Sequence, residues 1–207
     1  MAYGDAICKL VIENVELLEE APNVIEEVEN KVFKEINNRI KTFFANREGW
    51  KEDGVYTFLE DIEDAQTTFA PIDWPEDEDK NYTAYYSFRS GSGEDYQYWL
   101  TALVGKTSAD RFGIYFEVDC NSVGMNKRQW KNFLASQYQK QPFLQESNVL
   151  LEESSLCIPI IIDSKLMAEE YPFFETCLKP VDDALEILLK VNQIIDAVVR
   201  EAQGDVY

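Results

Sequence analysis

The residues of this chain with the most chemical potential are carboxylates, and eleven of them lie between Lys51 and Lys80 with no basic residue among them. The chain has 207 residues, a formal net charge of −20 and no histidine. Carboxylates at this density repel one another, which works against a compact fold, and they attract positively charged partners. The eleven are Glu52, Asp53, Glu60, Asp61, Glu63, Asp64, Asp73, Glu76, Asp77, Glu78 and Asp79.

The lack of histidine excludes several catalytic arrangements, because a Ser-His-Asp triad, a Cys-His pair and an H-E-x-x-H zinc motif each require an imidazole. The segment Gly105-Lys106-Thr107 lacks the upstream glycine of a phosphate-binding loop and fits a hairpin turn. The four cysteines are widely spaced and typical of buried free thiols in a reducing cytoplasm: Cys8, Cys120, Cys157 and Cys177. We therefore expect no cofactor and no metal site built on these residues.

Apolar periodicity indicates which elements carry the charges. Apolar residues make up 45% of the chain and aromatic residues 13%, enough to fill a core, so we expect a folded protein. Pro22 is expected to close the first helix, and Asn23 with Glu26 forms a capping-box pattern at the start of the second. Spacings of three and four residues predict helices over 5–20, 24–46, 53–66, 126–139 and 180–203.

A period of two predicts the strands, and residues 67–81 are expected to form a loop. Short turns between the first three strands are typical of an antiparallel meander. We predict a single α+β domain over residues 1–207, in which a three-stranded meander and one or two further strands pack with a long N-terminal and a long C-terminal helix. The expected strands cover residues 82–88, 96–104, 112–118, 148–151 and 156–162.

This order of elements over residues 24–162 resembles the core of the PD-(D/E)xK nuclease superfamily. In that family an Asp near the start of the second strand and an E-x-K on the third bind magnesium and activate water. Here Asp95 would start the second strand and Glu117-Val118-Asp119 would end the third. Asp119 stands where the family has its lysine, so the cation that polarises the attacking water is missing. The resemblance implies a divergent Mg²⁺-dependent nuclease, or an inactive relative, that uses Asp95, Glu117 and Asp119.

Charge favours a different class of function. A nucleic-acid ligand requires Lys and Arg to displace its counterions, and the small basic group Lys127, Arg128 and Lys131 fits the solvated face of a helix. The composition instead predicts a cytoplasmic, non-enzymatic binding or inhibitor protein that docks on a basic, nucleic-acid-handling protein and contacts neither nucleic acid nor membrane. Immunity proteins, antitoxins and the nucleic-acid mimics that phages and mobile elements use against host defence have this character. A helical assembly subunit that dimerises through residues 24–46 or 180–203 is a third possibility.

The predicted contact surface combines acidic residues with one tryptophan. A rigid aromatic inside a charged rim commonly anchors an interface, although Trp74, between two prolines, could equally pin its loop to the core. Solubility alone would also explain an acidic segment. The predicted partner-binding residues are Glu60, Asp61, Glu63, Asp64, Asp73, Trp74, Glu76, Asp77, Glu78 and Asp79.

Overall fold

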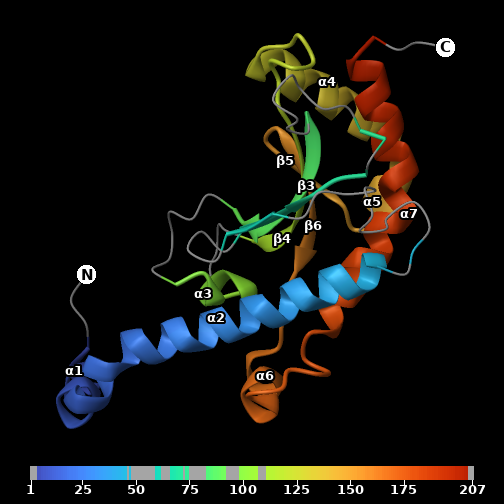
Figure 1. Ribbon diagram of the computed structural model, residues 1–207. Helices are drawn as coiled ribbons and strands as arrows, with labels where there is room; N and C mark the ends of the chain where they lie inside the picture. The colour runs from blue at the N-terminus through green and yellow to red at the C-terminus, as the bar shows by residue number, and fades with distance from the viewer. Residues whose placement is uncertain are drawn as a thin grey trace.

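Alternating large apolar residues build the central strands of an antiparallel sheet in the computed structural model (Figure 1). The structure describes residues 4–45, 47, 59–61, 66–71, 73–74, 83–91, 98–106 and 111–204. Within these residues the sheet has six strands in the order β1-β2-β3-β4-β6-β5. Their bounds are β1 Leu59–Asp61, β2 Gln66–Phe69, β3 Ala84–Ser90, β4 Phe112–Val118, β5 Leu150–Glu152 and β6 Ser155–Ile160.

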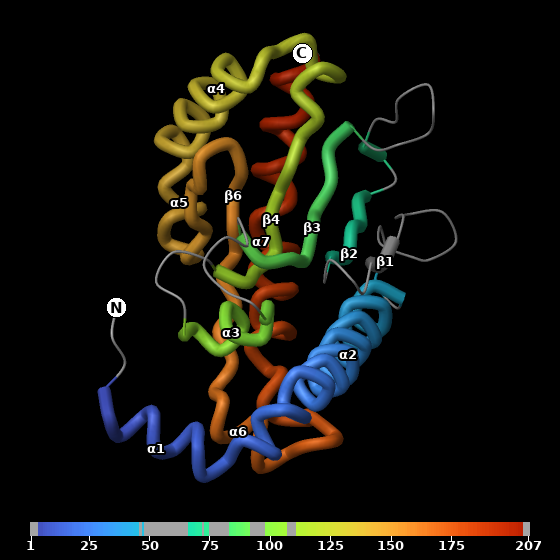
Figure 2. Tube along the Cα trace, turned by 90° about the vertical axis from the view of Figure 1, so that its left-hand side faces the viewer, coloured from blue at the N-terminus to red at the C-terminus, as the bar shows by residue number. Residues whose placement is uncertain are grey.

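Two long helices cover one face of this sheet (Figures 1 and 2). The longer is α2 and the other is α7, and α4 lies beside α7. None of the described helices is both long and apolar enough to cross a membrane. The helices are α1 Asp5–Glu13, α2 Val15–Ala45, α3 Leu100–Leu103, α4 Lys127–Lys140, α5 Pro142–Glu146, α6 Ser164–Glu170 and α7 Lys179–Ala202.

Aromatic rings fill the space between the helices and the sheet. The ring centroids of Phe33 on α2 and Phe88 on β3 are 6.5 Å apart, and those of Phe44 on α2 and Phe69 on β2 are 5.4 Å apart. The buried Tyr86 hydroxyl donates a hydrogen bond of 2.7 Å to Asn192 on α7. Burial of each large apolar side chain stabilises the fold by about 1.5–3 kcal/mol, so this layer supplies much of the cohesion between helices and sheet.

The α+β class with its antiparallel meander and its long N-terminal and C-terminal helices is confirmed. The strand predicted over 82–88 appears as β3, and the strand over 112–118 is β4. The Asn126 side chain caps α4 by accepting a hydrogen bond from the Gln129 backbone N–H, and the Asn126 backbone N–H donates one to the Gln129 side chain. The spacing and capping residues predict these elements correctly because each element also packs an apolar face against the core.

The prediction that Pro22 ends a helix is wrong, because α2 runs through it from Val15 to Ala45. Proline lacks the N–H that would bond the Leu18 carbonyl, and both residues are exposed, so water can satisfy that carbonyl. Asn23 is therefore inside the helix and caps nothing. The break lies earlier, at Asn14, whose side chain donates to the carbonyl of Leu10 at 2.8 Å.

Three further assignments differ from the prediction. Residues 59–61 form β1 and not a helix, because they pair with β2, which itself replaces part of the loop predicted over 67–81. The alternation over 96–104 does not give a strand at its end, since residues 100–103 form α3. There one helical turn buries the adjacent residues Ala102 and Leu103 together, which a strand would place on opposite faces.

Candidate functional site

The structure describes part of the predicted acidic contact surface. Glu60 and Asp61 lie in β1, the terminal strand of the described sheet, where their backbones pair with Thr67 and Gln66. Asp73 is exposed. Six predicted residues lie outside the described residues: Glu63, Asp64, Glu76, Asp77, Glu78 and Asp79.

Trp74 lies in the core, with only 2% of its surface exposed. Its ring centroid is 5.0 Å from that of Tyr86 and 5.7 Å from that of Phe116. The indole N–H donates to Asp196 on α7 at 3.2 Å. The sequence leaves two roles open for Trp74, a contact with a partner or an anchor for its loop. In the structure its ring is buried and joins the loop to the sheet and to α7.

Two of the three carboxylates of the alternative metal site have partners within the fold. Glu117 forms an ion pair of 2.5 Å with Arg89, and Asp119 accepts hydrogen bonds from the Asn121 N–H at 3.1 Å and the Ser122 hydroxyl at 2.7 Å. Asp95 lies outside the described residues. Within the described ranges no group of three or more Cys, Asp or Glu is arranged to hold a metal ion.

The sheet face opposite the long helices carries polar side chains. The Arg89 guanidinium lies 4.2 Å above the ring of Tyr115, whose hydroxyl donates to the Arg111 carbonyl at 2.9 Å. Burial raises the pKa of the neighbouring Cys157 thiol to about 12. A thiol with that pKa is protonated at neutral pH and is a poor nucleophile, so this cluster stabilises the sheet and has no reactive sulfur.

Most arginines form ion pairs within the molecule. Five of the six form ion pairs with carboxylates of the same chain, at distances between 2.5 and 2.9 Å. Most of these pairs join segments far apart in the sequence, which is why sequence patterns alone do not reveal them. The pairs are Arg39–Asp182, Arg47–Glu186, Arg89–Glu117, Arg111–Glu152 and Arg200–Asp196.

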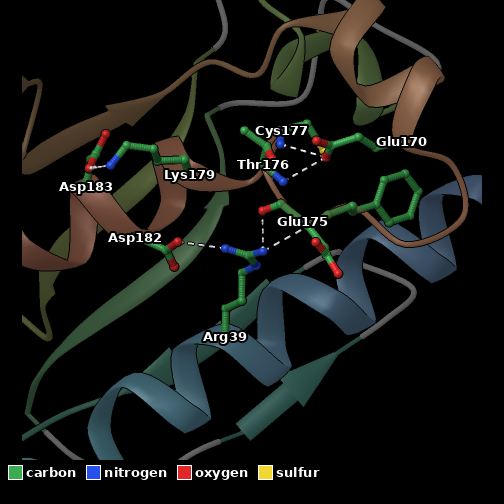
Figure 3. Close-up of polar contacts among 9 residues, drawn as sticks. Arg39, Glu170, Glu175, Thr176, Cys177, Lys179, Asp182 and Asp183 are labelled. Atoms are coloured by element: carbon green, nitrogen blue, oxygen red, sulfur yellow. Dashed lines mark hydrogen bonds and ion pairs between the residues drawn. The ribbon is translucent and has the colours of Figure 1, made fainter.

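Arg39 links α2 to α7 and to the segment that precedes α7 (Figure 3). From α2 its guanidinium donates to Asp182 at 2.7 Å and to the carbonyls of Phe174 and Glu175 at 3.1 and 2.6 Å. Glu170, at the end of α6, accepts hydrogen bonds of 2.8 Å from two backbone N–H groups, those of Thr176 and Cys177. These contacts hold the segment between α6 and α7 against α2 and fix the side chains that it carries.

The structure also reveals an exposed apolar surface that the sequence analysis missed. Val15 and Leu18 belong to the apolar face of the helix predicted over residues 5–20, yet they are 57% and 46% exposed. The residues of α1 are all exposed. Their spacing is a sound signal for an amphipathic helix, but spacing does not tell which molecule covers the apolar face.

Comparisons with protein-family models, with curated proteins and with solved structures find no match for this chain.

Proposed function

We propose that this chain is a non-enzymatic acidic binding protein that docks on a basic, nucleic-acid-handling protein and inhibits it. An immunity protein, an antitoxin or a nucleic-acid mimic of a phage or mobile element would act in this way. The acidic segment between Glu52 and Asp79 is its proposed contact surface, and the cytoplasm is the proposed compartment.

The internal pairing of the arginines is the observation that carries this proposal. Arginine is the side chain best suited to two-point contacts with phosphate, and five of six are already bound to carboxylates of the chain. The chain also carries 39 acidic residues against 19 basic ones, so its surface is expected to be predominantly negative. Such a surface repels phosphate and accelerates association with a basic protein.

The position of the described acids is consistent with a local contact surface. Glu60 and Asp61 are in the terminal described strand, and exposed Asp73 is next to Trp74, which anchors that turn to α7. An anchored turn loses little conformational entropy when a partner binds. In this proposal the carboxylates steer the encounter and occupy positions that the partner uses for phosphates, while Trp74 acts from within the core.

A charge-matched pair of variants tests the proposal. The first replaces Glu76, Asp77, Glu78 and Asp79 with serine. The control replaces four exposed acids on other elements and has the same net charge: Glu146, Glu153, Glu169 and Glu175 to serine. Each protein is immobilised and exposed to an extract of the native source at low salt, followed by elution with a salt step.

We expect wild type and the control to retain basic nucleic-acid-binding proteins that salt releases, because exposed charges are screened beyond ~8 Å at physiological ionic strength. The first variant is expected to lose them. Equal retention by both variants would show that net charge, and not this surface, is responsible, and the proposal would fail.

A further inference from the structure

A second surface lies in the segment between α6 and α7, which we call the aromatic loop and define as residues 171–178. Phe173 and Tyr171 of this loop are exposed, at 77% and 41%, although both carry large apolar rings. Phe174 and Cys177 of the same loop are buried and join it to the core. The loop therefore presents one aromatic ring fully to solvent, beside a second ring that is partly covered.

Contacts within the chain fix the shape of the aromatic loop (Figure 3). Arg39 donates to the carbonyls of Phe174 and Glu175, and the Glu170 carboxylate accepts from two backbone N–H groups of the loop. Phe174 has a φ of 44°, a left-handed conformation that a bulky residue keeps only where the surroundings enforce it, most often at binding and catalytic sites. An aromatic ring on such a fixed loop loses little conformational entropy on binding, which suits a residue that anchors an interface.

An apolar groove of about 490 Å³ adjoins the aromatic loop, because Tyr171 and Phe174 form part of its wall. Their rings meet edge to face, with centroids 5.7 Å apart. The rest of the wall comes from α2, α3 and α6 and includes Val24, Leu100 and Ala168. Apolar grooves accept the side chains that an amphipathic helix of a partner presents at spacings of three, four and seven residues.

Carboxylates accompany the exposed ring of the loop. Residues 166–178 include Glu169, Glu170 and Glu175 but no lysine or arginine. Glu170 accepts hydrogen bonds from the loop, whereas Glu169 and Glu175 are exposed, one on each side of Phe173 along the chain. An aromatic ring accompanied by carboxylates attracts a lysine or an arginine, which can lie over the ring and form an ion pair.

Three basic residues around the groove have acidic neighbours in the same chain. Lys31 on α2 donates to Glu27 at 2.6 Å and to the Tyr171 hydroxyl at 2.7 Å. Lys106 and Lys165 interact with the charge of Asp163, which caps the start of α6, at the opposite end of this helix from the aromatic loop. The acidic end of the groove is therefore the end formed by the aromatic loop.

We propose that the groove and the aromatic loop bind a basic amphipathic helix of a partner protein. Apolar side chains of that helix fill the groove, while one of its lysines or arginines lies over Phe173 and pairs with Glu169 or Glu175. A helix with an acidic polar face would place its charges against these carboxylates and is disfavoured. The basic character of the partner rests on the proposed function, but the surface consists of residues outside the segment from Glu52 to Asp79.

Three synthetic peptides of ~18 residues, about five helical turns, test the proposal. The basic peptide has leucines on one helical face and lysines on the other, the acidic peptide has glutamate in place of lysine, and the scrambled peptide has the basic composition without an apolar face. Fluorescence anisotropy at physiological ionic strength measures their binding to the full chain. We expect the basic peptide to bind at least ~10-fold more tightly than the other two, and equal binding of either would overturn the proposal.

Truncation of the exposed ring tests the contact with the loop. Phe173→Ala should weaken binding of the basic peptide at least ~10-fold, because anchoring aromatic rings dominate interfaces. Phe143→Ala, which removes an exposed ring from α5, is the control and should bind as wild type does. Both side chains are exposed, so the fold is expected to persist. Wild-type affinity in Phe173→Ala would refute the proposed contact.

A charge-matched pair of double variants tests the acidic rim. Glu169→Gln with Glu175→Gln should weaken binding of the basic peptide about 5-fold, whereas Glu146→Gln with Glu153→Gln removes the same charge from exposed positions elsewhere and should have no effect. Equal losses in the two double variants would show that the peptide responds to net charge alone, and the proposal would fail.

The variant with serine at positions 76–79 distinguishes failure of this proposal from failure of the proposed function. It is expected to bind the basic peptide as wild type does, because exposed charges are screened beyond ~8 Å at physiological ionic strength. A loss of peptide binding as large as that of Phe173→Ala would overturn the inference about the groove. Unchanged retention of basic proteins from the extract by the same serine variant would refute only the proposed function.

Discussion

Replacing Arg39 with methionine removes the contact that binds α2 to the segment before α7. Methionine keeps an apolar stem of similar length and lacks the guanidinium. The substitution deletes the ion pair of 2.7 Å with Asp182 and the hydrogen bonds to the carbonyls of Phe174 and Glu175. Both carbonyls must then find water or remain unsatisfied.

The expected cost follows from the exposure of each group. The Arg39 side chain is 20% exposed and that of Asp182 is 44% exposed, so solvent screens the ion pair and we assign it about 0.5–1 kcal/mol. A hydrogen bond from a charged donor contributes about 1.5–3 kcal/mol when buried, and the contact to the Glu175 carbonyl is exposed, so we take the lower end for both. Arg39→Met should therefore lower the free energy of unfolding by about 3.5–4 kcal/mol.

Arg47, two residues beyond the end of α2, offers a comparable control. It also pairs with a carboxylate of α7, Glu186 at 2.7 Å, but the side chains are 38% and 49% exposed. It also stacks on Phe43 at 3.9 Å, and solvent exposure keeps the total near 0.5–1 kcal/mol. Urea denaturation followed by circular dichroism measures both variants, with equal slopes required for comparison. If Arg39→Met costs no more than Arg47→Met, the structural role assigned to Arg39 is wrong.

Two further predictions concern packing and pH. Gly113→Ala should destabilise the protein by at least ~1–3 kcal/mol, because the new Cβ would lie 2.5 Å from the backbone oxygen of Ile158 in the neighbouring strand. Gly4→Ala is the control, since a Cβ at that position meets open space and should have no effect. Thermal unfolding measures both variants, and equal melting temperatures would refute the prediction. The pKa of Glu170 is lowered from 4.5 by hydrogen bonds from the backbone N–H groups of Cys177 and Thr176, so its stabilising effect is complete above pH 4.5 and is lost as pH falls through the lower folded-state pKa. The unfolding free energy is therefore expected to fall less steeply from pH 6 to acidic pH in Glu170→Gln than in the control variant Glu169→Gln. Identical pH profiles for the two variants would contradict the assignment.

Local signals in the sequence predict the elements whose stabilising contacts are also local. The helix predicted to start at Asn126 is α4, which this residue caps, and the apolar alternation predicted over 82–88 and 112–118 gives β3 and β4. Pro22 misleads, because a proline weakens a helix without always ending it, and here the Leu18 carbonyl that loses its partner is on an exposed residue. The period over 53–66 fits a helix, but pairing with β2 decides the structure of residues 59–61.

The site is less predictable than the fold, because it depends on contacts between distant segments. Arg39 and Asp182 are 143 positions apart, and no spacing rule joins them. The sequence around Trp74 does not distinguish a contact with a partner from the hydrogen bond to Asp196 on α7 that the structure shows. The apolar residues of α1 and of the first turns of α2 are visible in the sequence, but only the structure shows that the described part of the chain leaves them exposed.

The most direct test of the central claim, that the acidic surface occupies a nucleic-acid site on a basic protein, is competition. The protein captured by this chain is held in complex and titrated with duplex DNA at fixed, low salt, while release of the complex is measured. We predict mutually exclusive binding, with DNA displacing this chain. A stable ternary complex, in which DNA leaves the affinity for this chain unchanged, would contradict the claim.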